Sequence, residues 1–91
     1  MVVVKRMSQK DRLIARLKMK PTDFSIQELD TLMNKCGCHK YNRGRTSGSA
    51  IAYIHVATKR VLSLHSPHPQ KLLKTYMVKM VLEFLQDVSE I

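Results

Sequence analysis

The segment from Arg43 to Ser49 carries the side chains best suited to bind a phosphodiester. It consists of Arg43, Gly44, Arg45, Thr46, Ser47, Gly48 and Ser49. Guanidinium groups pair with phosphate bidentately, glycines let backbone N–H groups approach an anion closely, and hydroxyl groups add neutral donors. The Gly-Lys-Ser/Thr ending of a nucleotide-binding P-loop is missing, and a strand is expected to follow instead of a helix. We therefore predict contact with a nucleic-acid backbone; a solvated hairpin loop is the alternative interpretation.

Two histidines form the second group of residues that could do chemistry. His65 and His68 are separated by two residues, next to Pro67 and Pro69. Because imidazole titrates near neutrality, the pair could take a proton from a ribose 2′-hydroxyl and return one to a leaving 5′-oxygen without a metal. The alternatives are a hydrogen-bonded histidine at a strand edge, or half of a metal site. The remaining possible ligands lack a recognised zinc spacing relative to the pair, so we predict no metal and no cofactor; they are Cys36, Cys38, His39 and His55.

The charge of the chain indicates an anionic partner. Its 91 residues include 16 Lys and Arg against 7 Asp and Glu, a net charge of +9. The basic excess lies in residues 1–20 and 41–70, so nucleic acid, an acidic protein or a membrane surface would suit it. The length fits one domain, residues 1–91, and excludes a multidomain enzyme. The apolar runs are too short to cross a bilayer and no secretory signal is evident, so we expect a cytoplasmic protein.

Two helices are predicted ahead of the arginine segment. The first begins after Ser8 and carries basic side chains from Lys10 to Lys20 around an apolar stripe, a possible phosphate-facing surface. The second begins after Ser25, which forms a capping box with Glu28, and Gly37 is placed to end it. Its predicted buried stripe is Leu29, Leu32, Met33 and Cys36.

Three strands and a last helix follow. We expect strands around Tyr41, over 49–56 and over 60–65, with a tight turn at 57–59. A three-residue turn would pair Ile54 with Leu62 and Ala52 with Leu64, leaving Ala50 near Ser66. The last helix is expected from Gln70, with a core stripe of Leu73, Met77, Met80, Phe84 and Leu85. This order, α-α-β-β-β-α, predicts an α+β two-layer domain in which helices cover one face of a three-stranded antiparallel sheet.

From about Phe24 to Leu85 the chain resembles the HicA family of bacterial toxins. The similarity rests on the helix that ends at Gly37, Gly48-Ser49 before the middle strand, Pro67-His68-Pro69 after the third strand, and the following Lys71, Leu72, Leu73 and Lys74. The resemblance implies a small basic protein with a fold like the double-stranded-RNA-binding domain (dsRBD), which cleaves mRNA as an mRNA interferase and has a HicB-like antitoxin partner. Residues 1–23 are an extra basic helical segment.

One position departs from the family pattern. The usual catalytic histidine of the family follows the Gly-Ser directly, and this chain has Ala50 there. Either the chemistry has moved to His65 and His68, or the protein binds RNA without cutting it.

Our first hypothesis is a metal-independent endoribonuclease toxin. In it, Arg43 and Arg45 hold the phosphate, His68 moves protons with His65 as its partner, and the remaining small residues position the backbone; these are Thr46, Ser47, Gly48 and Ser49. The alternatives are a non-catalytic RNA-binding module that blocks translation, and a protein-interaction module with an acidic partner.

Overall fold

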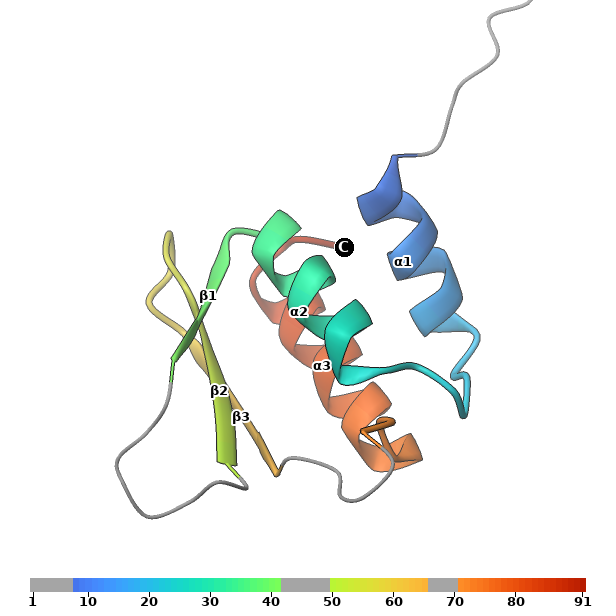
Figure 1. The fold of residues 1–91 in the computed structure, drawn as a ribbon. Coiled ribbons are helices and arrows are strands. Elements are labelled where there is room, and N and C mark those ends of the chain that lie inside the picture. The colour runs from blue at the N-terminus through green and yellow to red at the C-terminus, as the bar shows by residue number, and fades with distance from the viewer. Residues whose placement is uncertain (1–7, 42–49, 66–70) are drawn as a thin grey trace, which may run out of the picture.

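The structure is a computed structural model that describes residues 8–41, 50–65 and 71–91. It contains three helices and three strands in the expected order (Figure 1). The elements are α1 (Gln9–Lys18), α2 (Ile26–Lys35), β1 (Cys38–Tyr41), β2 (Ala50–His55), β3 (Val61–His65) and α3 (Thr75–Asp87). The α+β fold class predicted from the sequence is therefore confirmed.

Local signals start the first two helices and end the second as predicted. The Ser8 side chain accepts a hydrogen bond from the Asp11 N–H while the Asp11 carboxylate accepts one from the Ser8 N–H. Ser25 and Glu28 form the same reciprocal capping box at the start of α2. Gly37 follows α2 with φ +76°, in the left-handed region that glycine adopts without steric strain. Each of these signals acts within a few residues, so the helix limits follow from the sequence.

The three strands form an antiparallel sheet in the order β1-β2-β3. The observed register pairs Tyr53 with Leu62 and Ile51 with Leu64, so the pairing predicted from a three-residue turn is wrong by one position. Ala50 therefore pairs with His65, and Ser66 lies outside the described residues.

The cause is the length of the connecting turn. The His55 N–H donates to the Arg60 carbonyl at 2.8 Å, and the Lys59 N–H donates to the His55 carbonyl at 2.7 Å with Lys59 at φ 64°. This pairing leaves four residues between His55 and Arg60. Because side chains alternate with a period of two, the extra residue exchanges the two faces of β3 relative to β2.

The register decides which side chains meet the helices. Ile51 and Tyr53 of β2 and Leu62 and Leu64 of β3 are cross-strand pairs, and all four are buried in the core cluster with residues of the helices. The opposite face carries His39, Tyr41, Ala50, Ala52, Ile54, Val61, Ser63 and His65. Helices α2 and α3 lie on one face of the sheet, and α1 packs against both of them on the side away from it (Figure 1).

The approach to α3 differs from the expectation. The helix begins at Thr75 and not at Gln70, because residues 71–74 are not helical: Lys71 is in the left-handed region with φ 57°, and Lys74 is extended. This stretch pairs with the chain ahead of α2: the Leu73 N–H donates to the Phe24 carbonyl at 2.7 Å, and the Lys71 carbonyl accepts from the Ile26 N–H at 3.0 Å. The start of α3 is thereby fixed to the start of α2.

The core stripe of α3 also differs in one member. Met77, Phe84 and Leu85 are buried as predicted, but Met80 is 37% exposed. Val78 and Val81 are fully buried and complete the stripe. Met80 has the right spacing from its neighbours along the helix, but it lies at the margin of a stripe that is centred on the valines.

Candidate functional site

The described residues that flank the predicted site segments lie at the end of the sheet where β2 begins and β3 ends. Ala50, the first residue of β2, is the cross-strand partner of His65, the last residue of β3. The arginine segment ends directly before Ala50, and the residues that lead to His68 begin directly after His65. Both segments therefore join the sheet at the same end. Of the predicted site residues the structure describes His65; the others lie outside the described residues and are Arg43, Arg45, Thr46, Ser47, Gly48, Ser49 and His68.

The ladder geometry brings the two side chains at this end close together. Hydrogen-bonded and non-hydrogen-bonded pairs alternate along an antiparallel ladder, and the His55 N–H bond to Arg60 fixes the alternation. Ala50 and His65 then form a non-hydrogen-bonded pair, the type whose side chains approach more closely. Both side chains leave the sheet on the face opposite the helices. A side chain at position 50 and the His65 imidazole thus lie side by side on this face of the sheet.

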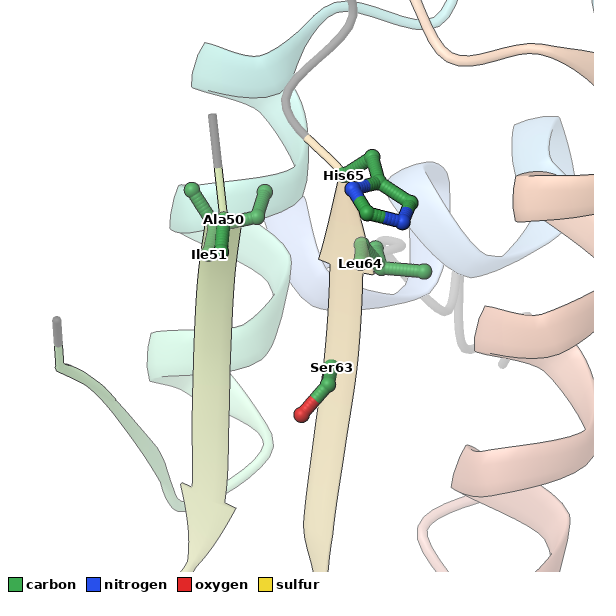
Figure 2. Close-up of a pocket in the computed structure, with 5 residues that line it drawn as sticks. All are labelled: Ala50, Ile51, Ser63, Leu64 and His65. Carbon is green, nitrogen blue, oxygen red and sulfur yellow. The ribbon is translucent and has the colours of Figure 1, made fainter. Parts of the chain in front are cut away.

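An open hollow lies around this pair. It has a volume of about 400 Å³ and is lined by Ala50, Ile51, Ser63, Leu64 and His65 (Figure 2). Its volume is within the usual range for ligand sites, roughly 300–1,000 Å³. The His65 side chain is exposed, so its ring nitrogens are accessible to a ligand in the hollow.

A second histidine of the sheet, His55, is buried and contacts other side chains through both ring nitrogens. His55 is 3% exposed; its Nε2 lies 2.9 Å from the Glu90 carboxylate and its Nδ1 lies 2.8 Å from the Thr58 hydroxyl. Glu90 also accepts a hydrogen bond from Lys10 of α1 at 3.1 Å. The hydrogen bond from His55, together with that from Lys10, holds the pKa of the Glu90 carboxyl below its usual range. His55 therefore links the sheet to the C-terminal segment, and both of its nitrogens are engaged.

The two cysteines are packing residues. Cys36 and Cys38 are buried and free. Burial raises the pKa of the Cys38 thiol to about 11, so the thiolate that would act as nucleophile or metal ligand is disfavoured near neutral pH. Within residues 8–41, 50–65 and 71–91, no three His, Cys, Asp or Glu side chains are placed to hold a metal ion.

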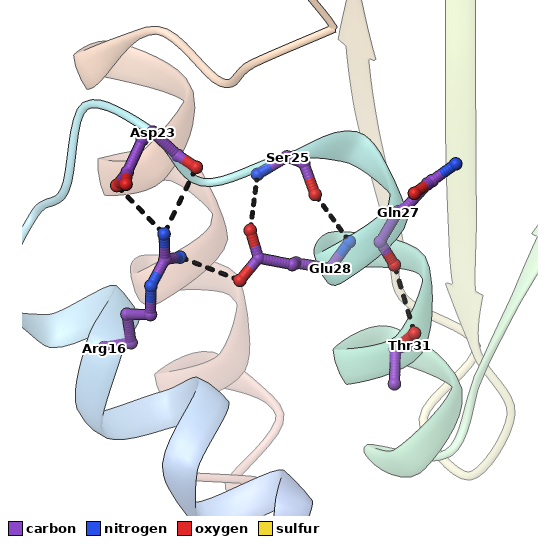
Figure 3. Close-up of polar contacts among 6 residues, drawn as sticks. All are labelled: Arg16, Asp23, Ser25, Gln27, Glu28 and Thr31. Atoms are coloured by element: carbon purple, nitrogen blue, oxygen red, sulfur yellow. Dashed lines mark hydrogen bonds and ion pairs between the residues drawn. The ribbon is translucent and has the colours of Figure 1, made fainter.

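The basic side chains of α1 are partly engaged inside the protein. Arg16 lies between Asp23 and Glu28: its Nη2 donates to Asp23 at 2.9 Å and its Nη1 is 2.9 Å from the Glu28 carboxylate (Figure 3). The same guanidinium lies 5.1 Å from the centroid of the Phe24 ring. Since Lys10 is bound to Glu90, the predicted phosphate-facing surface loses two of its cations. Arg12, Lys18 and Lys20 remain exposed.

A polar contact joins α2 to the sheet through the buried Tyr53. The Tyr53 hydroxyl donates to the Asp30 carboxylate at 2.6 Å, and Lys40 pairs with the same carboxylate at 3.2 Å. Burial, then the hydrogen bond to Asp30, raises the pKa of Tyr53. Tyr53 is therefore a core residue, whereas Tyr41 lies partly exposed on the face opposite the helices.

Topology and sequence together define the class of the protein. From α2 to α3 the chain runs α-β-β-β-α, with an antiparallel sheet covered by two helices, which is the dsRBD-like arrangement. The family model described as "HicA toxin of bacterial toxin-antitoxin" matches residues 26–86, more than half of the chain. The chain belongs to the HicA toxin family. It is a toxin of a toxin–antitoxin system, and the family implies an antitoxin as partner.

The other comparisons add no relative. No curated protein and no solved structure matches the chain. Helix α1 lies ahead of the matched residues, which begin with Ile26 of α2. No helix in the described parts of the chain is long and apolar enough to cross a membrane.

Proposed function

We propose that this toxin is a metal-independent endoribonuclease that cleaves mRNA, with His65 in the place of the missing family histidine. The observation that carries the proposal is the cross-strand pairing of Ala50 with His65. The family resemblance puts the usual imidazole at position 50, and the register puts an imidazole on the neighbouring strand, in the close type of pair. The imidazole is then supplied by β3 in place of β2, at the same end of the sheet.

The reaction uses two proton transfers and one displacement. One imidazole removes the proton of a ribose 2′-hydroxyl, the 2′-oxygen attacks phosphorus, the bond from phosphorus to the 5′-oxygen breaks, and an imidazolium protonates that oxygen. The products are a 2′,3′-cyclic phosphate and a free 5′-hydroxyl. We assign the proton transfers to His68 and His65, and stabilisation of the phosphate charge to Arg43 and Arg45. Backbone positioning falls to Thr46, Ser47, Gly48 and Ser49.

The net charge of +9 supports RNA as the substrate, since a polyanion gains affinity by releasing counterions from a basic surface. The same surface would suit an acidic, HicB-like antitoxin that covers the site in the cytoplasm. The antitoxin and mRNA would then compete for one face of the toxin.

The test is cleavage of a defined mRNA by purified protein in the presence of EDTA. We expect products with 2′,3′-cyclic phosphate ends, and a loss of rate of about a hundredfold or more in His65→Ala and in His68→Ala. His39→Ala is the matched control, because His39 is also an exposed strand histidine but lies at the other end of the sheet, opposite Ile54. Intact RNA with the parent protein, or equal rates in all three variants, would exclude this mechanism.

The absence of a histidine at position 50 favours a second candidate, an RNA-binding toxin that blocks translation without cutting. Its signature is salt-sensitive RNA binding with the RNA intact and with unchanged affinity in His65→Ala and His68→Ala.

A further inference from the structure

The first turn of α3 carries an exposed aromatic ring beside two lysines. Tyr76 is 50% exposed, and Lys71 and Lys74 are exposed on the non-helical stretch just ahead of the helix. We call these three residues the lysine–tyrosine surface. A cationic track next to an accessible aromatic face is the combination that binds single-stranded nucleic acid, because phosphates meet the cations while a base stacks on the ring.

The geometry places this surface at the same end of the sheet as His65. Tyr76 and Asp87 are eleven residues apart and lie on one flank of α3, with Met80 and Glu83 between them. Asp87 lies 3.6 Å from Arg60, just ahead of β3, so this flank faces β3. Helix and strand run in opposite directions, and both the end of β3 and the start of α3 lie at the lower end of the molecule in Figure 1.

The two spans also agree in length. Eleven helical residues rise about 16 Å, and five strand residues from Arg60 to His65 rise about the same distance. Because Asp87 is level with Arg60 at one end, Tyr76 is brought level with His65 at the other. Tyr76 lies on the helix side of the sheet and the His65 side chain on the opposite side, but β3 is an edge strand, so an RNA strand that passes around this edge contacts both.

The charges around the surface are arranged for an anion. The nearest acids of the adjoining segment, Asp23 and Glu28, are both paired with Arg16. The acids on the Tyr76 flank, Glu83 and Asp87, lie about two and three helical turns away. Helix α3 has no acidic residue in its first turn and no side-chain cap, so its N-terminal N–H groups add a positive potential there.

The surface is also held in place before any ligand arrives. The carbonyl of Lys71 accepts from the Ile26 N–H, and Leu73 donates to the Phe24 carbonyl, so the stretch that carries both lysines is fixed to the start of α2. A preorganised surface loses less entropy on binding than a flexible one.

From this placement we propose that the lysine–tyrosine surface is a nucleotide-binding subsite for single-stranded RNA, in which Tyr76 stacks on a base next to the phosphodiester held at His65. The inference rests on the proposed function in taking RNA as the ligand. It adds the residue that positions the neighbouring nucleotide, and it restricts the substrate to RNA that is unpaired at this point, because a base stacked on Tyr76 is not stacked in a duplex.

The experiment measures binding of a 2′-O-methyl RNA oligonucleotide, which lacks the attacking hydroxyl, by fluorescence anisotropy at several salt concentrations. Tyr76→Ala should weaken binding by about tenfold or more, whereas Tyr76→Phe, which keeps the ring, should stay within about twofold of the parent. The double variant Lys71→Gln/Lys74→Gln should reduce the slope of log affinity against log salt by about 1.4, the value for two phosphate contacts on a single strand. Lys35→Gln is the matched control, because Lys35 is an exposed lysine at the end of α2, one helix length from the start of α2 where this surface is fixed.

Equal affinities for Tyr76→Ala and Tyr76→Phe would overturn the inference, and so would a slope for the double variant equal to that of Lys35→Gln. No binding of the oligonucleotide by the parent protein would overturn it as well. Cleavage assays separate this result from the proposed function. A protein that binds through Tyr76 but never cuts RNA keeps the subsite and loses the endoribonuclease assignment. If the parent protein cuts RNA and Tyr76→Ala binds the oligonucleotide as tightly as the parent, the endoribonuclease assignment is kept and the subsite is lost.

Discussion

At the scale of the residue, two histidines of the sheet that are ten positions apart differ in burial and in hydrogen bonding. His55 lies on the helix-covered face with both nitrogens engaged, by Thr58 and by Glu90. His65 is exposed on the other face, at the end of its strand. A neutral imidazole with its proton on Nε2 satisfies both partners of His55, because the ring then donates to Glu90 and accepts from the Thr58 hydroxyl.

The contacts of Glu90 predict a pH dependence of stability. Its pKa is lower in the folded protein than the ordinary value of 4.5, so the folded state favours the carboxylate. The stabilisation is therefore complete above about pH 4.5 and is lost as the pH falls through the folded-state pKa. We expect Glu90→Gln to lower the free energy of unfolding by about 1 kcal/mol at pH 7, with a difference that shrinks towards pH 3.

Urea denaturation at several pH values measures this difference. The control is Glu83→Gln, an exposed carboxylate of α3, which should stay within about 0.5 kcal/mol of the parent at every pH. Equal stability of the two variants at pH 7 would contradict the role assigned to Glu90.

At the scale of the element, the β2–β3 turn sets the register and with it the place of His65. Lys59 sits in this turn with φ 64°, where a side chain strains the backbone and glycine does not. We expect Lys59→Gly to raise the free energy of unfolding by about 0.5 kcal/mol, because relief of the strain exceeds the added entropy of the unfolded chain. Ala57→Gly in the same turn should lower it by about 0.5–1 kcal/mol, since Ala57 does not have a positive φ.

Thermal denaturation of both variants at pH 7 checks the turn. Destabilisation by Lys59→Gly, to the same extent as by Ala57→Gly, would mean that the turn does not hold Lys59 in the left-handed region. The register that follows from this turn would then be in question.

The elements also show where sequence reasoning succeeds and where it stops. Ser8 and Ser25 start helices through partners three residues away, and such short-range signals are readable in the sequence. The register is not, because Ile51, Ala52, Tyr53 and Ile54 are apolar in succession, so β2 has no alternation to show which face is buried.

At the scale of the whole molecule, local sequence patterns do not predict the features that depend on partners far apart in the chain. Glu90 reaches His55 across 35 positions, and the stretch from Lys71 binds the chain ahead of α2. The lysine–tyrosine surface is not evident from the net charge of the last twenty-one residues, which is zero, although their lysines come first and their acids last. For the candidate site, the position of His65 at the end of β3 was predictable, and convergence of His68 with the arginine segment stays a prediction.

The central claim is that His65 has taken over the position that the family gives to the residue after Gly48-Ser49. The most direct measurement is cleavage of the same mRNA, in EDTA, by His65→Ala and by the double variant Ala50→His/His65→Ala, with the fold of both confirmed by circular dichroism. The two positions are cross-strand partners, so the account predicts that His65→Ala loses activity and that the histidine introduced at position 50 restores at least a tenth of the parent rate. A tenth of the rate corresponds to an activation barrier about 1.4 kcal/mol higher than that of the parent. A folded double variant as inactive as His65→Ala, or a His65→Ala variant as active as the parent, would contradict the account.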